Sequence, residues 1–281
     1  MTPRHSPTVQ SRRLGKELRR LRQRAGLTIH VAARHLGCSA SKISRMETGN
    51  SGVGLADVRV LLNLYQVGDA EAEELMSLAR QARQKGWWEP YGEVLSGSYV
   101  GLEAAAETIR GYEVQVVPGL LQTAAYARAM IGGARLDIDD EELDRRVNVR
   151  MARQALLTQH DPVKLSVILD EALFRRLVGG REVMREQFER LLGAVDLPNV
   201  VIQVLPFAVG AHAGMEGGFA ILHYADAGDT DVVFAENAAG GLFLTKDEEL
   251  RRYDVIFDHL REKALDPDES RAFIAASIRE L

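Results

Sequence analysis

Hydroxyl-bearing and cationic side chains between Leu27 and Gly49 have the types and spacing that suit contact with duplex DNA. Arginine can donate two hydrogen bonds to a guanine edge, while hydroxyl groups and lysine bind base edges or phosphates. The side chains that we assign to base edges are those of Ser41, Ser44 and Arg45. We assign Thr28, Ser39 and Lys42 to phosphate, because free amides at helix N-termini also attract anions.

Two short helices around a tight turn are needed to present these side chains. Thr28 is placed to cap a helix from Ile29 to Leu36, which Gly37 ends because glycine tolerates a left-handed backbone. Ser39 is placed to cap a second helix, from Ala40 to Thr48. This spacing is typical of a helix-turn-helix unit, whose second helix enters the major groove. The alternative is an ordinary helical hairpin whose polar face is only solvated.

Several short motifs around this unit also point to a known family. They are Ala25-Gly26-Leu27-Thr28, Leu36-Gly37, Ser39, Ile43-Ser44, Glu47 and Gly49. On these residues, the segment from Leu14 to Tyr65 resembles the five-helix, lambda-repressor-like domain of Xre/Cro-type regulators. The resemblance implies that Ala40, Ser41 and Arg45 face the bases of double-stranded DNA.

The same resemblance implies one structural contact and shows one departure. It implies a buried ion pair between Arg22 and Glu47, which ties the first helix to the recognition helix. The family usually has Gln at the position of Ile29, where its side chain contacts phosphate. Isoleucine cannot make that contact, and His30 is the neighbouring polar residue.

Charge is divided unevenly along the 281 residues. Residues 1–86 contain 15 Lys and Arg against 7 Asp and Glu, a net charge of +8, whereas the remainder has a net charge of −13. A basic head on an acidic body is expected when a DNA-binding module is joined to a regulatory domain. We therefore predict a flexible arm over 1–10, a DNA-binding domain over 11–86 and a regulatory or partner-binding domain over 87–281.

The composition also limits the class of protein. An apolar content of 46% and a charged content of 27% are those of a soluble globular protein. No apolar run is long enough to cross a membrane, and no secretion signal is evident, so we expect a cytoplasmic, nucleoid-associated location. Cys38 is the only cysteine, which excludes an internal disulfide and makes a structural zinc site improbable. We expect no cofactor.

The rest of the first domain is predicted to be helical. Apolar stripes predict helices over 11–24, 55–65 and 69–84, with Asp69 as the cap of the last. Ile43 and Met46 are expected to face the core. The stretch from Trp87 to Gly92 marks the junction, where paired tryptophans could clamp the domains together or line a cleft.

Helical and strand patterns then alternate, which predicts an α+β domain with a mixed sheet. The predicted helices cover 100–110, 123–130, 139–157, 171–178, 181–194, 246–264 and 267–280. The predicted strands cover 113–117, 163–169, 200–205, 219–224, 232–235 and 242–245. Asp266 with Pro267 is a strong helix start.

This second domain also contains recognisable motifs. They are Trp87-Trp88, the stretch 112–123, Arg150, Arg153-Gln154, Leu169-Asp170-Glu171 and the stretch 197–213. On these motifs it resembles the uncharacterised C-terminal domain of WhiJ-like regulators. The resemblance implies a transcription factor often paired with a small partner protein, in an arrangement likened to antitoxin–toxin pairs.

Signs of catalysis in the second domain are weak, so we expect that the protein is not an enzyme. Asp170 and Glu171 lie at a strand end, where acids more often cap the next helix than catalyse. His212 and His223 lack companion metal ligands. The glycine-rich loop over 206–218 lacks a phosphate-binding Gly-Lys-Ser/Thr motif, and it could be either a ligand-binding loop or a mobile connector.

Three functional hypotheses follow. The first is a sequence-specific DNA-binding transcriptional regulator whose C-terminal domain senses a small molecule or a protein partner. The second is an antitoxin-like interaction protein that sequesters a small cognate partner and regulates its own synthesis through DNA. The third, an enzyme tethered to DNA, is disfavoured because no catalytic cluster is evident. The first hypothesis predicts a homodimer on half-sites about 34–36 Å apart.

Overall fold

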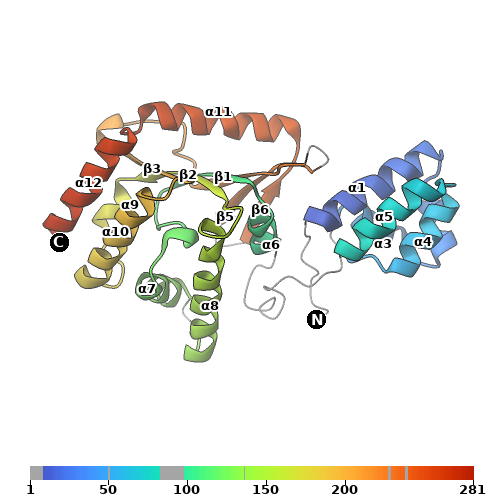
Figure 1. Cartoon of the computed structure of the whole chain (residues 1–281), viewed down its shortest axis with the longest axis horizontal. Coiled ribbons are helices and arrows are strands. Elements are labelled where there is room, and N and C mark those ends of the chain that lie inside the picture. Colours follow the sequence, from blue (N-terminus) through green and yellow to red (C-terminus); the bar gives the residue numbers. More distant parts are fainter. Residues whose placement is uncertain (1–8, 50, 83–97, 136, 227–228, 238–239) are drawn as a thin grey trace. The chain divides into compact units, whose positions relative to one another are not determined.

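The computed structural model describes residues 9–49, 51–82, 98–135, 137–226, 229–237 and 240–281 (Figure 1). The chain divides into two compact units, 1–105 with 226–230, and 106–225 with 231–281. The predicted arm, apart from its last two residues, and the tryptophan-containing junction lie outside the described residues. The fold class predicted from the sequence is confirmed, with a helical N-terminal region followed by a mixed-sheet α+β region.

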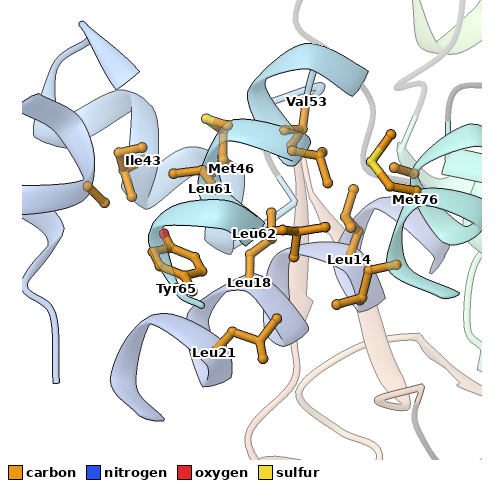
Figure 2. Close-up of a cluster of buried hydrophobic side chains, with 14 of the residues drawn as sticks. Leu14, Leu18, Leu21, Ile43, Met46, Val53, Leu61, Leu62, Tyr65 and Met76 are labelled. Carbon is orange, nitrogen blue, oxygen red and sulfur yellow. The ribbon is translucent and has the colours of Figure 1, made fainter. Parts of the chain in front are cut away.

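The first unit contains the five predicted helices and one more. They are α1 (Val9–Arg24), α2 (Ile29–Leu36), α3 (Ala40–Glu47), α4 (Leu55–Leu64), α5 (Asp69–Ala82) and α6 (Ser98–Ala104). Leucines at positions 14, 18 and 21 lie on one face of α1 because residues three and four apart share a helix face. They pack against Ile43 and Met46 from α3 and against Leu61, Leu62 and Tyr65 around α4 (Figure 2).

Local side-chain chemistry sets the ends of α2 and α3. The Thr28 hydroxyl accepts a hydrogen bond from the Val31 amide at 3.3 Å, and the Ser39 hydroxyl accepts one from the Lys42 amide at 3.1 Å. Gly37 has φ of 67°, which only glycine adopts at low cost. Asp69 was predicted to be the cap of α5, but the cap lies one position earlier. Asp69 is the first helical residue, and the Gly68 carbonyl accepts the first helical hydrogen bond, from the Ala72 amide.

The second unit is built on a six-stranded sheet in the order β3-β2-β1-β4-β5-β6. The strands are β1 (Thr108–Glu113), β2 (Lys164–Asp170), β3 (Val200–Leu205), β4 (Phe219–His223), β5 (Val232–Asn237) and β6 (Gly240–Leu244). Strands β1, β2 and β3 are parallel, whereas β4, β5 and β6 add antiparallel neighbours on the other side of β1. The sheet therefore changes from parallel to antiparallel pairing at β1.

Helices cover both faces of this sheet. They are α7 (Ala124–Ala134), α8 (Asp140–Arg153), α9 (Ala172–Arg175), α10 (Arg181–Val195), α11 (Asp247–Lys263) and α12 (Pro267–Glu280), with short 3-10 turns η2 (Gly119–Leu121), η3 (Gln154–Leu157) and η4 (Phe207–Val209). Figure 1 shows α11 along one face, with α7 and α8 on the other. Phe257 and Leu260 of α11 pack on Tyr112 and Phe219 of the sheet.

Two elements predicted just before and within the start of this unit had wrong bounds. The helix expected over 100–110 ends at Ala104, and the strand expected over 113–117 is replaced by β1, which ends at Glu113. β1 is hydrogen-bonded to β2 on one side and to β4 on the other. Pairing with strands far along the chain therefore outweighs the local helical pattern. The helix expected over 171–178 is also reduced, to α9.

Candidate nucleic-acid interface

The structure places most of the predicted DNA-contacting residues on the open surface of α2 and α3. Thr28, Ser39, Ser41, Ser44 and Arg45 are exposed, and Ala40 and Lys42 are half-buried. Ile43 and Met46 lie on the opposite face of α3 and are each 1% exposed. α3 is therefore amphipathic, with one face fixed in the core and one polar face accessible.

The accessible face of α3 is a compact hydrogen-bonding surface. Ser41, Ser44 and Arg45 are three and four positions apart, so they lie on the same side of the helix. The Arg45 guanidinium donates a hydrogen bond to the Ser41 hydroxyl at 3.1 Å. This contact holds the guanidinium along the helix surface, where its remaining N–H groups can bind another acceptor.

Lys42 differs from its neighbours because it already has an acidic partner. Its amino group lies 3.2 Å from the Asp57 carboxylate on α4, and both side chains are about one-third exposed or more. A half-exposed ion pair of this kind is weak and exchanges readily with other charges. A phosphate would have to displace Asp57 before Lys42 could bind it.

A buried ion pair fixes the far end of α3. The Arg22 guanidinium of α1 donates to both carboxylate oxygens of Glu47, at 2.6 and 2.9 Å, and to the Leu27 carbonyl at 2.7 Å. The hydrogen bonds to Glu47 raise the pKa of Arg22 above its usual range. Arg22 thus joins α1, the turn at Leu27 before α2, and the end of the recognition helix.

Two glycines allow α1 and α3 to approach closely. Gly49 was already part of the family motif, whereas sequence reasoning missed Gly15. A Cβ atom at Gly15 would lie 2.5 Å from the Met46 carbonyl oxygen and 2.8 Å from that of Glu47. At Gly49, φ is 74° and a Cβ atom would lie 2.8 Å from Arg12 Cγ. A glycine inside the strong helical pattern of α1 was the available signal, because glycine in a helix is otherwise unfavourable.

Two other basic residues of α1, Arg20 and Arg24, serve a structural role. Arg20 and Arg24 both pair with Glu71 of α5 at 2.8 Å. These contacts join α1 to α5 and partly neutralise that side of the head. Ile29 packs against the hydrophobic core of the first unit, so the family departure at this position adds apolar contact.

The second unit uses its strand-end acids for internal contacts. Asp170 accepts hydrogen bonds from the Tyr112 hydroxyl and the Ala172 amide, both at 2.9 Å. Glu171 accepts one from the Phe207 amide at 2.9 Å and pairs with Arg175. These hydrogen bonds lower the pKa of Glu171, although burial opposes them. Both acids thus help to hold the ends of β2 and β3.

The two histidines considered in the sequence also contact protein groups. The His212 ring packs edge-on against Tyr112, with ring centroids 5.8 Å apart. His223 Nδ1 lies 2.8 Å from the Asp231 carboxylate. Among the described residues, no three His, Cys, Asp or Glu side chains are grouped in a way that could hold a metal ion. In the same part of the chain, every helix is too short or too polar to cross a membrane.

Comparison with known families agrees with this arrangement of two units. Residues 13–75 match a family described as a helix-turn-helix domain, which supports a DNA-binding regulator. Residues 96–276 match a family described as a domain of unknown function, DUF5753. Because that match covers more than half of the chain, the protein belongs to the DUF5753 family. No curated protein and no solved structure matches the chain.

Proposed function

We propose that this protein is a sequence-specific transcriptional regulator that reads double-stranded DNA with α3. The observation that carries the proposal is the amphipathic placement of α3, whose buried side is anchored through Ile43, Met46 and Glu47. Its outer side presents Ser41 and Arg45 as donors. In the proposed complex, Ala40, Ser41, Ser44 and Arg45 face base edges in the major groove.

The proposed phosphate contacts lie at the helix N-termini. Thr28 and Ser39 cap α2 and α3 at their N-termini, where free amides and the helix dipole attract anions. Lys42 adds a charge once a phosphate displaces Asp57. Such contacts set the affinity and position of the head, while the α3 surface sets the sequence preference.

The proposal includes a homodimer and a sensing role for the second unit. Two heads related by a two-fold axis would read half-sites about 34–36 Å apart. The second unit would bind a small molecule or a protein partner and thereby change DNA affinity. We assign it no catalytic role, since Asp170 and Glu171 are already used to hold strand ends.

Selection of duplexes from a random library, followed by fluorescence anisotropy with the best sequence, tests the DNA-binding part. We expect Arg45→Ala to relax the preference at about one base pair, with a cost of roughly 1–3 kcal/mol. Lys42→Ala should weaken the binding of all duplexes alike and reduce the salt dependence of the affinity. The matched control is Arg80→Ala, which removes a half-exposed arginine from α5. Failure of the wild-type chain to bind any duplex at low salt would refute the proposal.

The resemblance of the second domain also allows an alternative, an antitoxin-like protein that mainly sequesters a cognate partner. Purification of the full chain from its native host separates the two possibilities. A regulator that senses a small molecule should elute as a homodimer. A stoichiometric second polypeptide that survives gel filtration would favour the antitoxin-like alternative.

A further inference from the structure

The parallel strands of the second unit bring three chain segments to one edge of the sheet. β1 ends at Glu113, β2 at Asp170 and β3 at Leu205, and the register of their pairing places these ends side by side. The sheet also changes from parallel to antiparallel at β1. In open sheets that contain parallel strands, ligands commonly bind beyond the carboxyl ends of such strands.

The loop between β3 and β4 lies against this edge. A Cβ atom at Gly214 would be 2.5 Å from Tyr112 Cε1, so the loop backbone lies directly on the tyrosine ring. A Cβ atom at Gly218 would be 2.9 Å from the Tyr112 carbonyl oxygen and 3.6 Å from Glu113 Oε2. The loop is therefore fastened over β1, and its main chain passes close to the Glu113 carboxyl group.

Glu113 differs from the other two acids at this edge because its side chain has no partner among the described residues. Asp170 and Glu171 accept the hydrogen bonds described above. The Glu113 side chain makes no hydrogen bond or ion pair with any residue in the part of the chain that the structure describes. Glu113 as a whole residue is nevertheless only half-buried. A recessed carboxyl group without a partner among these residues is available to a ligand.

The surroundings of Glu113 decide which ligand would suit it. Burial raises the pKa of Glu113 to about 8, the Arg150 charge opposes this rise, and the Glu236 charge adds to it. Arg150 is itself hydrogen-bonded to the Gln122 side chain at 3.0 Å. Because burial outweighs the Arg150 charge, an ionised carboxylate in this place is costly without a further positive charge. A ligand that brings such a charge would gain the attraction of both Glu113 and Glu236.

We propose that the edge beneath the β3–β4 loop binds a small organic cation, an amine or amidine, and that Glu113 forms the ion pair that anchors it. A metal ion fits this place less well, because a single carboxylate supplies too few ligands. The proposal names a ligand class for the proposed sensing role of the second unit. An effect of the cation on DNA affinity rests on that proposed function, but binding of the cation at Glu113 does not depend on α3.

Isothermal titration calorimetry on the full chain, without DNA, tests the binding step. The probes are benzamidine and agmatine, with benzamide as the uncharged isostere of benzamidine. At neutral pH the ligand should displace about one proton from Glu113, seen as a buffer-dependent heat, and this release should vanish near pH 9. Binding of benzamide as tight as that of benzamidine would overturn the proposal, as would the absence of binding by both cations.

Glu113→Gln is the decisive variant, since glutamine has the shape of the neutral acid and preserves the fold. We expect it to weaken the binding of both cations by at least about tenfold. The control is Glu216→Gln, which changes an 84% exposed acid in the same loop and should leave affinity unchanged. Equal affinity of Glu113→Gln and the wild type would refute the site. Carbon-13 NMR of the glutamate carboxyl groups in the wild type gives a check that needs no variant. One carboxyl signal should titrate near pH 8, and this titration should disappear when benzamidine is bound.

DNA anisotropy with and without the bound cation then tests the effector part separately. A change in operator affinity would support a sensing role for this site. If the cation binds but operator affinity stays constant, the effector role is refuted while the binding site stands. Loss of DNA binding by the head would leave the calorimetric result intact, so failures of the two proposals are distinguishable.

Discussion

Arg22 and Glu47 form a two-point ion pair across the core of the first unit, although they are 25 residues apart in the chain. Their side chains are 8% and 5% exposed. Because the planar guanidinium donates to both carboxylate oxygens, it fixes both the distance and the rotation between α1 and the end of α3. Since the other face of α3 carries Ser41 and Arg45, this pair sets the direction in which they point.

Glu47→Gln should destabilise the first unit strongly. The amide keeps the shape of the side chain but leaves the Arg22 guanidinium buried without its opposite charge. We expect a loss of about 3–5 kcal/mol, because breaking a buried pair from one side leaves an uncompensated charge. Urea denaturation of the full chain, followed by hydrogen exchange over α1 and α3, measures it.

Glu73→Gln is the matched control for that loss. It removes the partner of Arg80, but these two side chains are 73% and 50% exposed. An exposed pair contributes less than about 1 kcal/mol, so the control should unfold nearly as the wild type does. Equal losses for Glu47→Gln and Glu73→Gln would show that burial of the Arg22 pair has no energetic importance.

Gly15→Ala should separate α1 from α3. The added methyl group would meet main-chain oxygens of Met46 and Glu47, which cannot move without shifting α3. We expect a loss of about 1–3 kcal/mol, as for other overpacked cores, together with weaker operator binding. Thermal denaturation and anisotropy on the same samples measure the two effects.

Gly193→Ala is the control for Gly15→Ala. Gly193 lies in α10, is exposed, and has no atom near the position of an added Cβ. There alanine should stabilise the helix by about 0.5–1 kcal/mol, because it reduces the entropy lost on folding. The two variants should change the free energy of unfolding in opposite directions. A Gly15→Ala variant more stable than the wild type would contradict the close contact between α1 and α3.

The sequence revealed those features whose chemistry is local. Thr28 and Ser39 were predicted as caps because their hydroxyl groups bond amides three residues away, and α3 follows from that start. The strand β1 was missed because its conformation depends on β2 and β4, more than 50 residues downstream. Helical spacing of Leu102 and Ile109 therefore extended the predicted helix wrongly over 105–110, beyond the end of α6 at Ala104.

The residues that support the candidate site were also hidden for this reason. Gly15 matters only because α3 crosses α1 at that point, some 30 residues later in the chain. The surroundings of the Glu113 carboxyl group come from the β3–β4 loop and from Glu236 in β5, both about 100 residues downstream. No local pattern contains such information. The Lys42–Asp57 pair likewise needed the placement of α4 beside α3.

Asp57→Asn should strengthen DNA binding. The change frees Lys42 from its 3.2 Å contact and removes a negative charge from the side of α3. We expect about two- to fivefold tighter binding of operator and random duplex alike, since the half-exposed pair is worth less than about 1 kcal/mol. The gain should shrink as salt is added. Anisotropy at two salt concentrations measures it.

The control for Asp57→Asn removes the same charge elsewhere on the head. Glu74 is exposed on α5, so Glu74→Gln should change affinity much less. A gain from Asp57→Asn that persists when Lys42 is replaced by Ala would show that the ion pair is not the cause. In that case the removed charge alone would explain the effect.

Glu113 should make the second unit less stable as the pH rises. Its pKa is about 8 in the folded chain against an ordinary value of 4.5. Between these values the folded state holds a proton that the unfolded state has lost, so stability falls with rising pH by at most about 1.4 kcal/mol per unit. Glu113→Gln cannot titrate and should remove this slope. Urea denaturation of both proteins near pH 5, 7 and 9 measures the difference, and parallel curves for the two would contradict the raised pKa.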